Sequence, residues 1–152
     1  MDPSPFDIPY RGGFVGTEHR FALTVYFEDT DTAGIVYHAN YLRFFERARS
    51  DMLRAAGIDQ RAFLDAGGGA YAVTEMDIKW RRSARLDDDL LVVSRVTGVR
   101  AASCLIHQRV MRAGEVLAEA TVTAALVSPQ GRPVRQPAEW VETFKALERQ
   151  ED

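Results

Sequence analysis

The spacing of hydrophobic and polar residues divides the chain into segments with two different periods. Apolar and polar residues alternate over residues 19–28, which is typical of a strand with one buried face. Over residues 40–56 the apolar positions recur every three or four residues, which predicts one amphipathic helix that stops at Gly57. The apolar side of this helix is unusually aromatic, because it carries Tyr41, Phe44 and Phe45.

The second half of the chain has the pattern of successive strands. Alternating runs cover residues 71–82, 90–99, 103–112 and 116–128, and short turns separate the last three. Connections this short join antiparallel neighbours. A brief helical turn is predicted at residues 61–66, and a final helix begins at Pro137.

These elements predict a single α+β domain. An antiparallel five-stranded sheet wrapped around the long helix, with a C-terminal helix, is the economical way to bury the aromatic side. We expect this domain to span residues 19–150, and 152 residues are enough for one core. Residues 1–18 are rich in Pro and Gly and show no periodicity, so they are predicted to form an N-terminal arm.

Composition and charge narrow the class of protein. The net charge is −3, and Lys and Arg are nowhere concentrated as a nucleic-acid-binding surface requires. Cys104 is the single cysteine, which excludes an internal disulfide and a cysteine-based zinc site. The first residues do not resemble a signal peptide, and no apolar run approaches the ~20 residues of a transmembrane segment. The sequence therefore predicts a cytoplasmic enzyme or binding protein.

Residues 28–40 contain the combination with the clearest chemical meaning. An acidic turn that ends in Asp31 interrupts the first strand, a bend of small residues follows, and the helical pattern opens near His38. A carboxylate is thereby placed close to N–H groups at a helix start, which carry a partial positive charge. The carboxylate can act as base or nucleophile while the N–H groups polarise a carbonyl oxygen, so this segment suits attack on an acyl group.

The order of residues 28–41 resembles the signature of hotdog-fold acyl-CoA thioesterases, in particular the 4-hydroxybenzoyl-CoA thioesterase family and its tol-pal-associated branch. The likeness continues through residues 45–49 and 84–88 and covers about residues 19–145. It implies a hotdog fold and hydrolysis of acyl-CoA to a free acid and coenzyme A, without a metal or redox cofactor. It also implies a homo-oligomer, a dimer or tetramer, because the family builds its site across two chains. A link to an acyl carrier protein or an envelope complex is implied by the resemblance alone.

The same resemblance implies catalytic roles for two residues. Asp31 corresponds to the catalytic carboxylate, which acts either as a nucleophile that forms a mixed anhydride or as a base that activates water. His38 corresponds to the position at the helix start whose backbone N–H polarises the thioester carbonyl. Its imidazole is either a second acid or base or part of the pocket lining.

Three residues beside this pair are candidates for substrate binding. Tyr37 is expected to line the acyl channel or to pack against its neighbours. Asn40 is expected to cap the helix or to donate a hydrogen bond in the pocket. Tyr41 matches a family position at the helix start.

Basic side chains are expected to bind the phosphates of coenzyme A. The resemblance points to Arg100 and Ser103, near the turn between the third and fourth strands. Arg81, Arg82 and Arg85 form another basic group that fits the same role.

Other functions that these residues suggest were weighed against the thioesterase. The acidic turn imitates an EF-hand calcium loop, but Asn40 stands where that loop needs a Glu. It also imitates the nucleophile loop of haloacid-dehalogenase phosphatases, which requires Thr or Val in place of Ala33 and a parallel sheet. The three histidines lack metal-ligand spacing, so no metal site is expected. The serious alternative is a non-catalytic protein that binds acyl-CoA or an acyl carrier, and the presence of Asp31 favours the enzyme.

Overall fold

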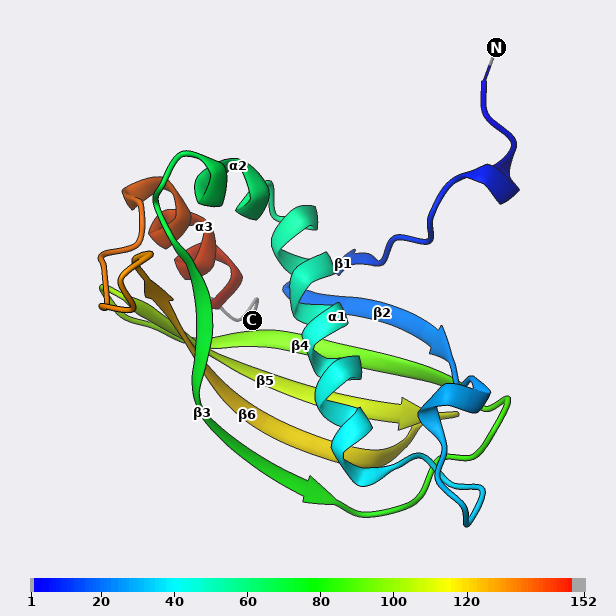
Figure 1. The fold of residues 1–152 in the computed structure, drawn as a ribbon. Coiled ribbons are helices and arrows are strands. Elements are labelled where there is room, and N and C mark those ends of the chain that lie inside the picture. The colour runs from blue at the N-terminus through cyan, green and yellow to red at the C-terminus, as the bar shows by residue number, and fades with distance from the viewer. Residues whose placement is uncertain (1, 149–152) are drawn as a thin grey trace.

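An antiparallel sheet in the order β1-β2-β4-β5-β6-β3 forms the frame of the protein (Figure 1). The computed structural model describes residues 2–148. The strands are β1 (Gly13–Val15), β2 (Glu18–Thr24), β3 (Ala70–Trp80), β4 (Asp89–Val99), β5 (Ser103–Arg112) and β6 (Glu115–Val127). The helices are α1 (Tyr41–Ala55), α2 (Gln60–Asp65) and α3 (Ala138–Glu148), and 3-10 turns lie at Pro5–Asp7, Phe27–Asp29 and His38–Asn40. The predicted helices and the four strands of the second half are confirmed to within about two residues at each end.

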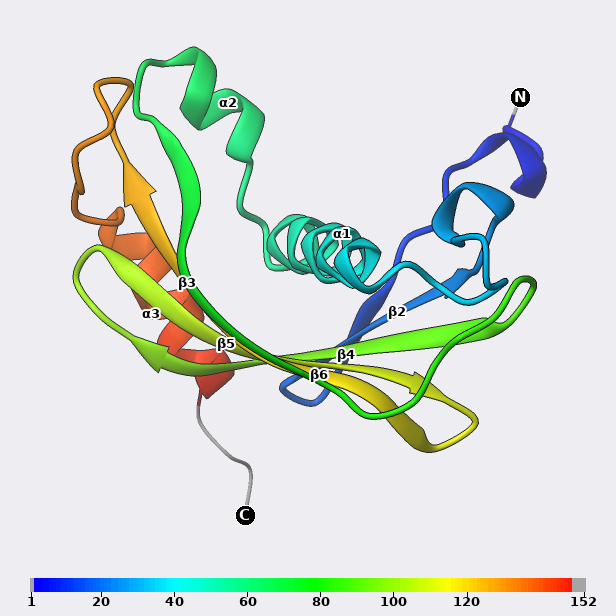
Figure 2. The ribbon, with the colours of Figure 1, turned by 60° about the horizontal axis from the view of Figure 1, so that its bottom comes forward.

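The long helix α1 lies across the concave face of the sheet, and its aromatic side forms the main core (Figure 2). Tyr41, Phe44 and Phe45 are buried and pack with inward-facing residues of β4, β5 and β6. Burial of one Phe side chain stabilises the fold by about 1.5–3 kcal/mol relative to an exposed position. Gln108 of β5 ties α1 to the sheet, because its amide donates to the Phe45 carbonyl at 3.0 Å and to the Ser94 hydroxyl at 2.9 Å.

The C-terminal end of α1 is covered by α3. Phe144 of α3 packs with Met52 and Ile106 in a second hydrophobic cluster, which also contains Cys104. Burial raises the pKa of the Cys104 thiol to about 12. The buried thiol is therefore protonated at neutral pH and unreactive.

The sheet has six strands, and the predicted number of five is therefore wrong by one. The additional strand is β1, which pairs with β2 across a tight turn at Gly16. Three residues are too few to show a period, and Gly16 adopts φ 60°, a conformation that glycine tolerates best. Since β1 lies within residues 1–18, the last part of the predicted arm belongs to the sheet. The domain division at residue 18 stays a prediction, and residues 149–150 of the predicted domain lie outside the described residues.

A buried histidine–carboxylate pair fastens this N-terminal hairpin to α1. His19 Nε2 lies 2.7 Å from Asp51 Oδ2, and the Gly12 N–H donates to the same oxygen at 3.0 Å. Nδ1 of His19 has no hydrogen-bond partner within residues 2–148. Burial lowers the pKa of His19, although the hydrogen bond and charge of Asp51 act in the opposite direction. The contacts therefore suit a neutral imidazole that carries its proton on Nε2.

β3 forms one edge of the sheet and, in the described part of the chain, pairs only with β6. It is 11 residues long, and its outer row of backbone N–H and C=O groups has no strand partner within residues 2–148. Val73 and Trp80 on this strand are about half exposed. A long exposed edge is a template for pairing with another chain unless charges, bulges or a covering element protect it.

Candidate functional site

The acidic turn holds the carboxylate of Asp31 at the surface before the helix start. One Asp31 oxygen accepts a hydrogen bond from the Ala33 N–H at 2.8 Å. Backbone hydrogen bonds close the turn, from the Gly34 N–H to the Asp31 carbonyl at 3.0 Å and from the Asp31 N–H to the Ile35 carbonyl at 2.9 Å. Gly34 has φ 80°, which explains why the bend contains a glycine. The local sequence thus fixes the direction of the carboxylate and leaves its second oxygen without a protein donor in the described chain.

The 3-10 turn His38–Asn40 precedes α1 and supplies the candidate oxyanion donor. The His38 N–H has no backbone or side-chain acceptor within residues 2–148. The imidazole packs edge-on against the rings of Tyr37 and Trp80, with centroid distances of 4.7 Å and 5.8 Å. Trp80 Nε1 also donates to the His38 carbonyl at 3.1 Å. Trp80 therefore positions the backbone that carries this N–H.

Asp31 and His38 line the same surface pocket, which has a volume of about 280 Å³. Its other walls come from the segment before α1, from Tyr41 and from the end of β3 with the loop that follows it. These residues are Ile35, Val36, Tyr41, Trp80, Arg81, Arg82 and Ser83. The structure thus brings the two predicted catalytic residues together. It adds Trp80 and Ser83, which the sequence pattern did not mark as site residues.

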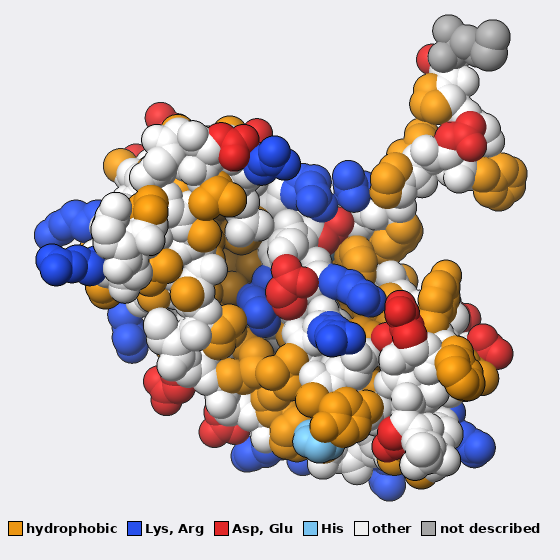
Figure 3. Space-filling model, in the orientation of Figure 1, with side chains coloured by type: hydrophobic (Ala, Val, Ile, Leu, Met, Phe, Trp, Pro, Cys, Tyr) orange, Lys and Arg blue, Asp and Glu red, His pale blue; other side chains and the backbone are white. Residues whose placement is uncertain are grey.

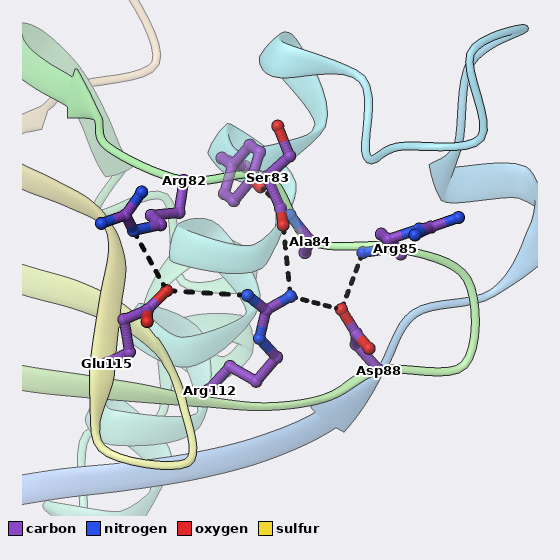
Figure 4. A network of polar contacts seen from close by, with 8 residues as sticks. Arg82, Ser83, Ala84, Arg85, Asp88, Arg112 and Glu115 are labelled. Carbon is purple, nitrogen blue, oxygen red and sulfur yellow. Dashed lines mark hydrogen bonds and ion pairs between the residues drawn. The ribbon is translucent and has the colours of Figure 1, made fainter.

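A network of charged side chains holds the loop between β3 and β4 beside this pocket (Figure 4). Arg112 of β5 donates to the Asp88 carboxylate at 2.8 Å and to the Ser83 carbonyl at 3.2 Å, and Asp88 accepts from the Arg85 N–H at 2.8 Å. Glu115 adds a longer ion pair with Arg112, at 3.6 Å. Desolvation alone would raise the pKa of Asp88, but the hydrogen bonds from Arg85 and Arg112 outweigh it and lower the pKa. Arg112 thus joins the Ser83 carbonyl and the Asp88 carboxylate in one network.

The three candidates next to the catalytic pair have different surroundings. Tyr37 is half exposed and contacts the neighbouring imidazole, but it does not line the pocket. Asn40 is buried, and its amide donates to the Asp29 carboxylate at 2.8 Å. Tyr41 is buried, and its hydroxyl accepts from the Ala84 N–H at 3.1 Å. Asn40 and Tyr41 thus hold the two loops of the site against the start of α1.

The first long strand ends earlier than its alternating pattern predicts, and Asp29 is the reason. β2 ends at Thr24, and the predicted end at residue 28 is therefore wrong. The buried Asp29 carboxylate accepts the Tyr26 N–H at 2.8 Å as well as the amide of Asn40, which turns the chain into a short 3-10 helix. Asp29 therefore has a structural role.

Arg100 and Ser103 lie at the other end of the sheet. They flank the turn between β4 and β5, where the Arg100 N–H donates to the Ser103 carbonyl at 2.8 Å. The segment after Asp31 instead meets the loop that leads into β4, through a bridge between Ile35 and Arg85. Within one chain, therefore, Arg100 and Ser103 do not join the pocket of Asp31.

A second pocket, of about 150 Å³, lies further along α1, between this helix and β3. Figure 3 shows the hollow, with hydrophobic and cationic side chains at its border. Glu46, Arg49 and Ser50 of α1 form one side, and Tyr71, Ala72 and Val73 of β3 form the other. The sequence pattern gave no sign of a pocket at this position.

Two kinds of site are absent from residues 2–148. No group of three or more His, Cys, Asp or Glu side chains in this range is arranged to hold a metal ion. No helix in the same range is long and apolar enough to cross a membrane.

Comparison with known proteins identifies thioesterases among the relatives of this chain. Residues 25–146 match the family model described as the thioesterase-like superfamily. The acyl-CoA thioesterase YbgC of Haemophilus influenzae is 41% identical over 128 residues, which are 84% of this chain and 94% of that protein. A probable thioesterase of Bartonella henselae superimposes with a TM-score of 0.74 at 36% identity, over 79% of this chain and 99% of its own. A thioesterase of Thermus thermophilus, solved with coenzyme A and zinc, gives a TM-score of 0.72 at 27% identity, over 85% and 93% of the two chains.

Proposed function

Because the chain belongs to the thioesterase-like superfamily, we propose that it is an acyl-CoA thioesterase, which hydrolyses acyl-CoA to a free carboxylic acid and coenzyme A. The observation that carries this proposal is the shared pocket of the Asp31 carboxylate and the unpaired His38 N–H at the start of α1. The relatives named above support the reaction class. The hotdog fold predicted from the sequence is confirmed by the family match and by the structural neighbours.

The carboxylate of Asp31 can start the reaction in two ways, and the geometry fits both. As a base it takes a proton from water, and the water oxygen attacks the thioester carbonyl carbon. As a nucleophile it attacks the carbon itself, and water then hydrolyses the resulting mixed anhydride. In both cases the carbonyl electron pair moves to oxygen, where the His38 N–H stabilises the negative charge. The C–S bond then breaks, and the thiolate of coenzyme A leaves and takes up a proton.

For the phosphates of coenzyme A, Arg81 and Arg82 are better placed in the same chain than Arg100 and Ser103. Both arginines line the pocket of Asp31 and are exposed. Each forms a surface ion pair with a glutamate, at 3.1 Å and 3.5 Å. Exposed pairs of this kind contribute roughly 0–1 kcal/mol, so a phosphate can replace the glutamate. Arg100 and Ser103 would bind these phosphates only if a second copy of the chain brings them to the pocket of Asp31.

We further propose that two copies of the chain pair through the free edge of β3. The edge is long and half exposed, and the family builds its site across two chains. In a two-fold antiparallel pair, the Trp80 end of one β3 meets the Tyr71 end of the other. The pocket of Asp31 in one chain then faces the pocket between α1 and β3 of the second copy. A tetramer, formed by pairing of two such dimers, rests on the resemblance alone.

The cofactor requirement, the acyl donor, the link to other proteins and the cellular location also stay predictions. Hydrolysis without a metal or redox cofactor predicts that extended dialysis against a chelator leaves the rate unchanged. An acyl carrier protein as donor and a link to an envelope complex rest only on the family resemblance. A cytoplasmic location rests on the sequence pattern.

The decisive experiment compares the wild-type protein with Asp31→Asn on a panel of short, long and aromatic acyl-CoAs, by release of the free thiol. We expect the amide to lose about 10²–10⁴-fold in kcat, because it is neither a base nor an anionic nucleophile. Glu28→Gln is the matched control, since Glu28 is an exposed carboxylate in the same acidic turn. It should change the rate less than about threefold.

The alternative function is a protein that binds acyl-CoA without hydrolysing it. Binding of acyl-CoA by a wild-type protein that releases no thiol from any member of the panel would establish that alternative. Equal losses in Asp31→Asn and Glu28→Gln would contradict the role of Asp31 specifically.

A further inference from the structure

The pocket between α1 and β3 has an apolar interior, and its α1 wall carries the charged side chains of Arg49 and Glu46. Its apolar part is lined by Leu53, Ile106, Ala124 and Phe144. Arg49 is one of the polar α1 residues that line the same pocket. A pocket of this kind suits an apolar chain that ends in a polar group.

Arg49 is held in place by a buried amide. The Arg49 guanidinium donates to the Gln108 carbonyl oxygen at 2.9 Å. Gln108 is buried, and both hydrogen bonds of its amide nitrogen, to Phe45 and Ser94, fix the direction of that oxygen. The guanidinium is therefore preorganised, and most of its five N–H groups remain for another acceptor.

Arg49 is half-buried, and no carboxylate in residues 2–148 lies within 4.0 Å of its guanidinium. Burial lowers the pKa of Arg49, and the charge of Glu46 opposes this shift. The guanidinium nevertheless stays charged at neutral pH. A partly buried cation without a counterion is unusual, because its desolvation is not compensated.

Glu46 does not neutralise the interior of this pocket. It is exposed, and it accepts a hydrogen bond from the Ser50 hydroxyl at 2.8 Å rather than one from Arg49. Water screens an exposed charge more strongly than a partly buried one. An acyl group inside the pocket therefore experiences mainly the positive charge of Arg49.

We propose that this pocket receives the far end of the acyl group and that Arg49 makes the enzyme selective for acyl chains that end in a carboxylate. The inference rests on the proposed thioesterase function and on the proposed β3 dimer. Within one chain, 11 residues of helical rise separate His38 from Arg49, roughly 16 Å, which is too far for a short acyl group. Across the dimer, the pocket of the second copy faces Asp31. A terminal carboxylate then forms a charge-assisted, bidentate pair with Arg49.

The test compares three acyl-CoAs of equal chain length, glutaryl-CoA, 5-hydroxypentanoyl-CoA and pentanoyl-CoA. The wild-type protein should hydrolyse glutaryl-CoA with a kcat/KM at least tenfold above the other two. Arg49→Met, which keeps the length of the side chain, should lose at least tenfold on glutaryl-CoA and less than threefold on pentanoyl-CoA. Arg49→Lys should keep a reduced preference, because a lysine retains the charge without the bidentate geometry.

Arg54→Met is the matched control, because Arg54 is an exposed arginine of the same helix that does not line this pocket. It should retain the wild-type preference for glutaryl-CoA. Melting curves of all variants show whether they fold. If Arg49→Met does not fold, the substrate ratio of the wild-type protein and of Arg49→Lys still decides the question.

The failure of this inference is distinguishable from the failure of the proposed function. Rapid hydrolysis of all three substrates with equal kcat/KM overturns the role of Arg49 and leaves the thioesterase intact. Equal preference for the hydroxyl and the carboxylate overturns the selection by charge. Absence of thiol release from every substrate overturns both proposals.

Discussion

At the scale of single residues, the protein uses polar side chains mainly to hold backbone in place. Asn40 and Tyr41 were expected to contact substrate, yet their visible partners are Asp29 and a backbone N–H. Asp31 differs from them, because its side chain is exposed and is bound by one backbone donor. Asn40 and Tyr41 thus hold the backbone of the site in place, whereas the Asp31 carboxylate stays accessible.

The pH dependence of stability should report the buried state of His19. Its pKa is about 6.5 when the chain is unfolded and is lowered in the fold. Below pH ~6.5 His19 is protonated in the unfolded chain but stays neutral in the folded protein. The free energy of unfolding therefore falls as the pH decreases, by at most about 1.4 kcal/mol per pH unit. The proton would occupy Nδ1, which has no acceptor within the described residues.

Denaturant titrations between pH 7.5 and 5.5 measure this effect. His19→Gln should flatten the dependence, since its amide can still donate to Asp51 but does not titrate. His107→Gln, which alters a half-buried histidine on β5, should keep it. An unchanged slope in His19→Gln would show that another group is responsible.

At the scale of elements, α1 combines three roles along its length. Its start supplies the unpaired N–H, its aromatic side fills the core, and its polar side carries Arg49. The link between α2 and β3 must turn the chain within a few residues, and it uses Gly67, Gly68 and Gly69. Gly69 has φ 106°, and a Cβ atom there would lie 1.9 Å from the Val127 carbonyl oxygen.

Gly69→Ala should therefore destabilise the protein by about 3 kcal/mol, through backbone strain and displacement of β6. Gly13→Ala is the control, because a Cβ atom at Gly13 meets nothing within 4 Å and its φ is not positive. It should change the free energy of unfolding by less than about 0.5 kcal/mol. Thermal or denaturant unfolding measures both, and equal stability of the two variants would contradict the close approach at Gly69.

At the scale of the whole molecule, one chain does not join its two pockets. The pocket of Asp31 and the pocket of Arg49 lie at different positions along α1, and the edge of β3 beside both is unpaired in this chain. In the proposed dimer, a second copy on that edge would bring one pocket of each kind together. Catalysis at low protein concentration would then depend on association.

Light scattering should give at least twice the mass of one chain for the wild-type protein at micromolar concentration. Val73→Glu places a charge on the half-exposed edge of β3 and should lower the mass to that of one chain. Val15→Glu is the control, since Val15 is an exposed valine on β1, at the opposite edge of the sheet. A monomeric wild-type protein, or a mass unaffected by Val73→Glu, would contradict the β3 interface.

Much of the fold could be predicted from the chain because its signals are local. The periods of two and of three to four residues follow from the geometry of strands and helices, so they marked α1 and the strands β3 to β6. β1 was not predicted, because a strand of three residues is too short to show a period. The end of β2 was predicted too late, because the alternating pattern continues past Thr24 whereas the hydrogen bonds of the buried Asp29 turn the chain there.

The sequence by itself determined the local part of the site, because the acidic turn, the bend and the start of α1 are consecutive. It therefore predicted that Asp31 and His38 are neighbours. Only the tertiary structure decided which distant residues complete the site. His38 and Trp80 are 42 residues apart in sequence, but the fold brings Trp80 Nε1 into hydrogen-bond contact with the His38 carbonyl. The same holds for Arg49, whose exposure, partner and pocket depend on Gln108 and β3. The local sequence does not predict such contacts, because they depend on how the sheet curves around the helix.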